Sequence, residues 1–151
     1  MRHIHPKGTI TLNDVLQSIR DRQDIDKAGA IGVFIGVCRG ETSRGEKVEG
    51  LTLEAYEEKA EETLTEICKS LEEREGIIAV EIHHMIGSFG VGEELVYVAV
   101  AGSHREYLFP VLEEAVETYK HRAPIFKKED TVDEKGRRKS RWTSETEASK
   151  Q

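Results

Sequence analysis

Two apolar stretches that lie close together in the sequence constrain the fold most strongly. Ile77–Ile86 and Leu95–Ala101 have the composition of strands, and little more than the glycine-rich link GSFGVG lies between them. Strands joined by so short a link pair antiparallel, because a parallel pair needs a crossover of a dozen or more residues. This pair argues against a doubly wound sheet in which every strand is followed by a helix.

The rest of the chain extends this order. Helical patterns cover about residues 11–19, 57–75 and 103–123, and strand patterns cover about 1–5, 30–38, 48–56, 124–129 and 140–143. Because strands repeatedly follow one another without a helix, we expect an α+β fold with a mainly antiparallel sheet and about three helices. Residues 30–38 are almost entirely apolar, which predicts a central strand covered on both faces.

Length and composition indicate one domain. We expect a single domain over residues 1–142 and a disordered polar tail over residues 143–151. The sequence contains no apolar run of about 18 residues, and its first residues lack the apolar core of a signal peptide, so we expect a cytoplasmic protein that does not bind membranes. Two cysteines are too few for a disulfide framework or a zinc site.

The charge distribution favours a small anionic ligand. The net charge of -7 argues against a general nucleic-acid-binding protein. Residues 1–119 carry 12 Lys and Arg against 23 Asp and Glu, whereas residues 120–141 carry nine against four. An acidic body with one basic sector suits a small anion better than a long polyanion.

The basic groups gather around Ser103–Glu129, which predicts an amphipathic helix followed by a short strand. Ser103 is a suitable N-cap, and Glu106 completes a capping box, so we expect the helix to begin there. In the strand that follows, Lys127 and Lys128 must point to opposite faces. The apolar stripe of the helix comprises Leu108, Val111, Leu112, Ala115, Val116 and Tyr119.

Three basic residues outside that strand are candidates for anion binding. His104 and Arg105 fall in the first turn of the helix, where the dipole is already positive, so their simplest use is an anion. The alternative is that Arg105 extends into solvent while His104 supplements the cap. Arg39 ends an apolar strand, either as a site residue or as a solvated turn residue.

The distance along the helix restricts how these groups can cooperate. Arg105 and Lys120 are separated by 15 residues, or about 22 Å of helix. They cannot hold one small ligand within a single chain. Either the chain has two sites, or one pocket at a dimer interface takes Lys120 from one subunit and His104 and Arg105 from the other.

No metal or other cofactor is expected. His83 and His84 are adjacent in a strand and must face opposite ways, so the two rings cannot easily chelate one ion. Cys68 lies on an apolar helix face and is expected in the core. Cys38, beside Arg39, is either a somewhat activated thiol or an inert one.

Several motifs together resemble the MoaE family, the large, catalytic subunits of molybdopterin synthase. The resemblance covers about residues 1–142. Its motifs are GAIGVFIGVCRG, LTLEAY, IHHMIGSFGVGE, SHR, YKHRAPIFKKE and the dipeptide RW at 141–142.

The resemblance implies a hammerhead-type α/β fold and a sulfurtransferase without a resident cofactor. Such an enzyme takes sulfur from the C-terminal Gly-Gly thiocarboxylate of a small ubiquitin-like subunit and converts cyclic pyranopterin monophosphate into the dithiolene molybdopterin. It is a homodimer that binds two small subunits, giving a heterotetramer. The implied roles are catalysis for Lys120 and Lys127, substrate binding for Arg39, His104, Arg105 and Arg141, and contact with the partner's tail for Phe34 and Val116.

Two other interpretations of the residues remain open. The chain could be an adaptor that docks a ubiquitin-like tail without sulfur chemistry. It could also be a single-chain anion- or nucleotide-binding domain that uses the basic sector from Lys120 to Arg141.

Overall fold

A computed structural model describes residues 1–144 of the chain. Within them, seven strands and three α-helices form the α+β fold that was predicted. The helices are α1 (Leu12–Arg20), α2 (Glu57–Glu72) and α3 (Arg105–Arg122), with a short 3-10 turn at Ile25–Lys27. The strands are β1 (Ile4–Pro6), β2 (Ala30–Val37), β3 (Lys47–Ala55), β4 (Ile77–Phe89), β5 (Glu94–Gly102), β6 (Ile125–Val132) and β7 (Arg138–Ser144).

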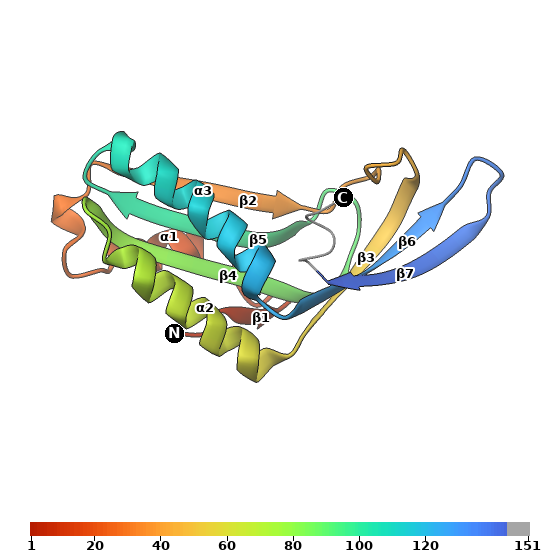
Figure 1. The fold of residues 1–151 in the computed structure, drawn as a ribbon, viewed down its shortest axis with the longest axis horizontal. Helices are drawn as coiled ribbons and strands as arrows, with labels where there is room; N and C mark the ends of the chain where they lie inside the picture. The colour runs from red at the N-terminus through yellow and green to blue at the C-terminus, as the bar shows by residue number, and fades with distance from the viewer. Residues whose placement is uncertain (145–151) are drawn as a thin grey trace.

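The strands form one sheet that changes direction along β4. The order is β2-β5-β4-β3-β6-β7, and every neighbouring pair on this path is antiparallel, while β1 pairs parallel with β4. β4 pairs with β5 through His84 and with β3 only from Gly87 onward. Gly87 has a φ of 133°, which other residues rarely adopt, and it marks this change of partner. The arm of β3, β6 and β7 consequently extends away from the helical body (Figure 1).

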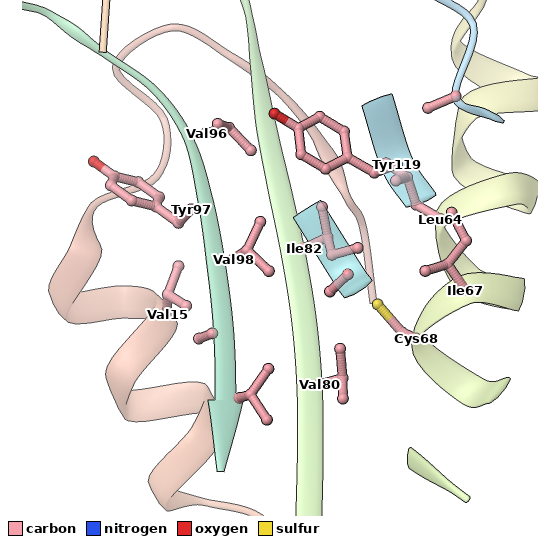
Figure 2. Close-up of a cluster of buried hydrophobic side chains, with 14 of the residues drawn as sticks. Val15, Leu64, Ile67, Cys68, Val80, Ile82, Val96, Tyr97, Val98 and Tyr119 are labelled. Atoms are coloured by element: carbon pink, nitrogen blue, oxygen red, sulfur yellow. The ribbon is translucent and has the colours of Figure 1, made fainter. Parts of the chain in front are cut away.

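The helices cover both faces of the body. α2 and α3 lie on one face of the sheet, and α1 packs on β4 and β5 from the other face. Side chains alternate accordingly: Val15 and Tyr97 lie on the α1 side, whereas Leu64, Ile67 and Tyr119 lie on the side of α2 and α3 (Figure 2). The core is therefore two apolar layers separated by one sheet.

The predicted stripe of α3 is confirmed, but the predicted cap is wrong. Four stripe residues are buried and the other two are partly buried against the core. The N-cap is His104, without a side-chain hydrogen bond, rather than Ser103. The backbone N–H of Ser103 donates to Gly76 at 2.8 Å, which holds the chain extended until Arg105 begins the helix.

β2 is an edge strand, so the prediction of a central strand is wrong. Within residues 1–144 it pairs only with β5. α3 covers one of its faces, but Ile31 and Ile35 on the other face remain 37% and 38% exposed. An apolar sequence alone does not distinguish a strand buried within its own chain from one with an uncovered face.

Two predictions at the chain ends have different outcomes. The first residues do form a strand, β1, as expected. β7 continues to Ser144, two residues beyond the predicted boundary at 142, and the rest of the expected tail, 145–151, lies outside the described residues. The predicted glycine-rich link between β4 and β5 is shorter than expected, because Gly87–Phe89 continue β4 and pair with β3; residues 90–93 form the turn, with Gly92 at a φ of 86°.

Candidate functional site

A cavity of about 590 Å³ lies where the end of β2, the C-terminal turn of α3 and the inner face of the β3-β6-β7 arm meet. Six basic and three acidic side chains line it, so its charge is net positive. They are Arg39, Arg44, Lys120, Lys127, Lys139 and Arg141, with Glu41, Glu46 and Glu129. A basic cavity in an acidic protein attracts a small anionic ligand.

Strand alternation places one lysine of β6 in this cavity and excludes its neighbour. Lys127 lines the cavity, and its Nζ lies 3.8 Å from Oε1 of Glu129, which faces the same way two residues later. Lys128 points to the opposite face, where its Nζ lies 5.8 Å from the ring centre of Trp142. The predicted divergence of the two lysines is thus observed.

Lys120 reaches the cavity from the last turn of α3. Its Nζ lies 5.9 Å from the ring centre of Phe34, which is close enough for a cation–π interaction. The carbonyl end of a helix favours a cation there. The structure therefore brings the two predicted catalytic lysines, Lys120 and Lys127, into one cavity from two different elements.

Arg39 and Arg141 enter the same cavity from opposite ends of the sheet. The backbone of Cys38 accepts a hydrogen bond from Gly92 N–H and donates one to Glu93, so the end of β2 is fixed to the β4–β5 turn. Arg39 follows directly and is exposed toward the cavity. Arg141 lies opposite Glu129 in the β6–β7 ladder.

Cys38 lines the cavity, but it is not an activated thiol. Burial raises the pKa of Cys38, and the carboxylates of Glu129 and Glu93 raise it further, while Lys127 opposes them. The thiol form is therefore favoured at neutral pH. Of the two interpretations considered above, this direction favours the inert thiol.

The structure adds cavity residues that sequence reasoning missed. Lys139 lines the cavity two residues before Arg141 on the same face of β7, a spacing that would have revealed it. His84 and Tyr119 form an edge-to-face pair in the wall with ring centres 5.7 Å apart. His84 Nδ1–H donates to the carbonyl of Met85 at 3.0 Å. The sequence singled out His84 only as a doubtful metal ligand.

Three predicted site residues lie outside the cavity of their own chain. His104 and Arg105 are exposed at the opposite end of α3, where the ring of His104 lies 6.3 Å from that of Tyr107. Val116 lies partly buried against the core, whereas Phe34, its predicted companion, does line the cavity. Arg105 and Lys120 lie in the same continuous helix, so the separation of about 22 Å that the helix rise implies applies to the folded chain.

No metal centre is found in the part of the chain that the structure describes. Within residues 1–144, no three His, Cys, Asp or Glu side chains are grouped so that they could hold a metal ion. His83 hydrogen-bonds Glu81 on the α1 face, whereas His84 contacts Tyr119 on the other. Among the same residues, no helix is long and apolar enough to cross a membrane.

Comparison with known proteins gives one consistent family. The family model described as "MoaE protein" matches residues 7–122. The molybdopterin synthase catalytic subunit of Vibrio cholerae is 37% identical over 116 residues, which are 77% of this chain and 73% of that protein.

Solved structures agree with this. The crystal structure of molybdopterin synthase from Staphylococcus aureus matches with a TM-score of 0.77 and 31% identity, covering 94% of this chain and 96% of that one. A Helicobacter pylori chain, 22% identical with a TM-score of 0.68 and coverage of 84% and 82%, shares the fold and comes from a complex of subunits 1 and 2 of molybdopterin-converting factor. The chain belongs to the MoaE family, the catalytic subunits of molybdopterin synthase in molybdenum cofactor biosynthesis.

Proposed function

We propose that this chain transfers sulfur from the C-terminal thiocarboxylate of a small ubiquitin-like subunit to cyclic pyranopterin monophosphate, forming the dithiolene of molybdopterin. The observation that carries the proposal is the convergence of Lys120 and Lys127 on one basic cavity. Both reactants are anionic, so a cavity lined by six cations suits them together.

Each transfer forms a carbon–sulfur bond and later breaks another. The thiocarboxylate sulfur attacks a side-chain carbon of the pyranopterin, which joins substrate and partner through a thioester. One carbon–oxygen bond of the attacked carbon breaks, and its oxygen leaves with the electron pair of that bond, protonated where a lysine supplies the proton. Water then cleaves the bond between the acyl carbon and sulfur, leaving a carboxylate on the partner and a thiolate on the substrate. An acyl intermediate on the amine of Lys120 before hydrolysis is an alternative route with the same balance. Two such transfers, each from one partner tail, supply the two sulfurs.

The two lysines stabilise the negative charge that develops during these steps. Lys120 and Lys127 orient the partner's tail, stabilise the oxyanion of the attacked acyl group and move protons. Arg39, just after β2, and Arg141, in the middle of β7, hold the anionic substrate. Phe34 provides an apolar wall against which the partner's extended tail lies, close to the ammonium group of Lys120.

The substrate phosphate requires a second copy of the chain. His104 and Arg105 are about 22 Å of helix away from Lys120, beyond the reach of one small ligand. We propose that they enter the cavity of a partner copy together with Val116 at its margin. A homodimer then has two complete cavities and takes two small subunits, which makes a heterotetramer. The complex described for the Helicobacter pylori protein supports an assembly with a second kind of subunit.

The proposal includes one domain over residues 1–142 and a cytoplasmic location. The continuous core over all three helices supports a single domain. The two cysteines of the described residues are both free, which is usual where thiols are kept reduced.

Single-turnover synthesis tests the proposal directly. Purified chain is mixed with thiocarboxylated small subunit and cyclic pyranopterin monophosphate, and molybdopterin is measured. Product is expected from the parent, and Lys120→Ala should reduce the rate at least about 100-fold, as is usual for loss of a group acting on the reacting atoms. No product from a folded parent that still binds the small subunit would replace this proposal with a non-enzymatic adaptor.

A further inference from the structure

The hydrolysis step proposed above needs a base that takes a proton from water. Lysine and arginine side chains ordinarily keep their protons at neutral pH, so the cations of the cavity serve poorly as bases. Of its three carboxylates, two belong to the loop between β2 and β3, and that of Glu129 lies 3.8 Å from the ammonium group of Lys127. His84 is the one histidine among the described residues that line the cavity, and imidazole is the side chain most often used as a general base.

The ring of His84 is held in one tautomer. Its Nδ1 lies 3.0 Å from the carbonyl oxygen of Met85, and a carbonyl can only accept a hydrogen bond, so Nδ1 carries the proton. In the neutral ring, Nε2 therefore carries the lone pair. Nε2 lies on the opposite edge of the ring from Nδ1, and so on the edge turned away from the backbone of β4. His84 thus presents its basic nitrogen from the buried wall of the cavity.

Three neighbouring elements fix the position of this ring. The backbone N–H of His84 donates to the carbonyl of His3 in β1 at 2.7 Å. In the ladder with β5, His84 lies opposite Val96, which also lines the cavity. Tyr119 of α3 packs edge-to-face against the ring, and Lys120, the next residue of α3, enters the same cavity. A base held from several sides beside a catalytic cation is preorganised for reaction.

The neighbouring His83 has a structural role on the other face of β4. Its two ring nitrogens lie 2.9 Å from Glu81 and 2.9 Å from His5, in the polar network on the side of α1. His83 is not among the described residues that line the cavity. Because successive residues of a strand face opposite ways, the two histidines separate a structural position from one that faces the cavity.

We propose that His84 is the general base of the hydrolysis step. The O–H bond of the attacking water breaks, its proton passes to Nε2 of His84, and its oxygen bonds to the acyl carbon of the thioester. The carbon–sulfur bond then breaks and leaves its electron pair on the sulfur of the substrate. The carboxylic acid on the partner and the imidazolium of His84 each release one proton to solvent. This inference rests on the proposed function and assigns a residue to its last step.

Rapid-quench single turnover with thiocarboxylated small subunit and cyclic pyranopterin monophosphate separates the two steps. Mass spectrometry measures the covalent adduct of small subunit and substrate, and the small subunit released from it with a carboxylate end. His84→Asn keeps a side-chain N–H near the position of Nδ1 but removes the base. The variant should form the adduct within about threefold of the parent rate and release it at least about 100-fold more slowly, so that the adduct accumulates.

The matched control is His83→Gln, which keeps a side-chain N–H directed at Glu81 and should accumulate no adduct. A second variant, His84→Ala, tests the chemistry by rescue. Imidazole added to it can enter the space that the ring leaves and should speed release at least about tenfold, without effect on the parent. Circular dichroism checks that each variant is folded.

Three results would overturn this role of His84. The first is a folded His84→Asn protein that releases the small subunit at the parent rate. The second is an equal loss of both steps without accumulation of adduct, which indicates a structural role. The third is a folded His84→Ala protein that imidazole does not rescue. In each of them an active parent leaves the proposed function intact, whereas a parent that forms neither adduct nor product would refute the proposed function and this role together.

Discussion

At the scale of single residues, the neighbours Lys127 and Lys128 provide a direct test of the site. Both side chains are positively charged and both residues lie in β6, but only Lys127 lines the cavity. Lys127→Ala should therefore reduce single-turnover sulfur transfer at least about 100-fold, because the oxyanion loses its cation. Lys128→Ala should change it less than about threefold, since it removes only a cation–π contact with Trp142. Equal losses of rate in the two variants would show that the rate depends on the total positive charge of β6 and not on the position of Lys127 in the cavity.

The two cysteines should be unreactive in the folded protein. Burial raises the pKa of Cys68 to about 12, and burial also raises the pKa of Cys38. Since the thiolate is the reactive form, alkylation by iodoacetamide at pH 8 should be at least about tenfold slower in the native chain than in denaturant. Mass spectrometry resolves the two sites. Rapid modification of native Cys38 would contradict the assignment of an inert thiol.

At the scale of secondary-structure elements, the sequence contains two capping-box patterns, Thr11 with Asp14 and Ser103 with Glu106, and only one of them forms a cap. Thr11 accepts a hydrogen bond from Asp14 N–H, and Asp14 accepts one from Thr11 N–H, so α1 begins with a complete capping box. Ser103 and Glu106 have the same spacing, but the helix begins after His104. The four-residue motif alone does not show that the backbone N–H of Ser103, just after β5, donates a hydrogen bond to the carbonyl of Gly76.

Because of this difference, two similar substitutions should lower the free energy of unfolding by different amounts. Thr11→Ala should lower the free energy of unfolding by about 1 kcal/mol, the usual value for a lost N-cap. Ser103→Ala should lower it by less than about 0.5 kcal/mol, because no side-chain cap is lost. Urea denaturation followed by circular dichroism measures both. A Ser103→Ala cost as large as that of Thr11→Ala would restore Ser103 as the cap.

β4 carries a buried polar network that was not predicted from the sequence. Glu81, fully buried, accepts hydrogen bonds from Ser18 and from His83, and Arg22 lies 3.4 Å away. With His83 Nε2–H directed at Glu81, its Nδ1 accepts a hydrogen bond from His5 of β1 at 2.9 Å. Burial alone would raise the pKa of Glu81, but the hydrogen bonds from His83 and Ser18 lower it overall.

The network predicts weaker folding in mild acid. Burial lowers the pKa of His3 and of His5 below 6.5, so the unfolded chain takes up protons first as the pH falls. Their contribution to stability is present above about pH 6.5 and is lost as the pH falls through the folded values. Glu81 acts in the same direction, but only below its ordinary value of 4.5.

Thermal unfolding between pH 7.5 and pH 5 measures the effect. The melting temperature of the parent should fall across this range, and the double variant His3→Gln/His5→Gln should show a shallower fall. His121→Gln, on the exposed end of α3, is the control and should follow the parent. A parent with constant stability over this range would contradict the assigned directions.

At the scale of the whole molecule, most features of the fold that depend on local sequence patterns could be predicted from the sequence. The antiparallel order, the stripe of α3 and the divergence of Lys127 from Lys128 all follow from local periodicity, and all are observed. The position of β2 does not follow from it. Its apolar residues predict a strand in the centre of the sheet, whereas they lie at its edge, because an apolar pattern does not determine where a strand lies in the sheet.

The separation of Arg105 from Lys120 belongs to the same scale, and it leads to the most decisive prediction. Lys120→Ala and Arg105→Ala should each be nearly inactive alone. If their cavities are shared between copies, equal mixing after dissociation gives half mixed dimers, each with one intact and one doubly altered cavity. Single-turnover activity should then return to about a quarter of the parent value. Mixing Lys120→Ala with Lys127→Ala should restore nothing, because both residues come from the same chain and no cavity becomes intact. Recovery in that control would mean that Lys120 and Lys127 act from different copies, and no recovery in the first mixture would mean that the two ends of α3 serve separate sites.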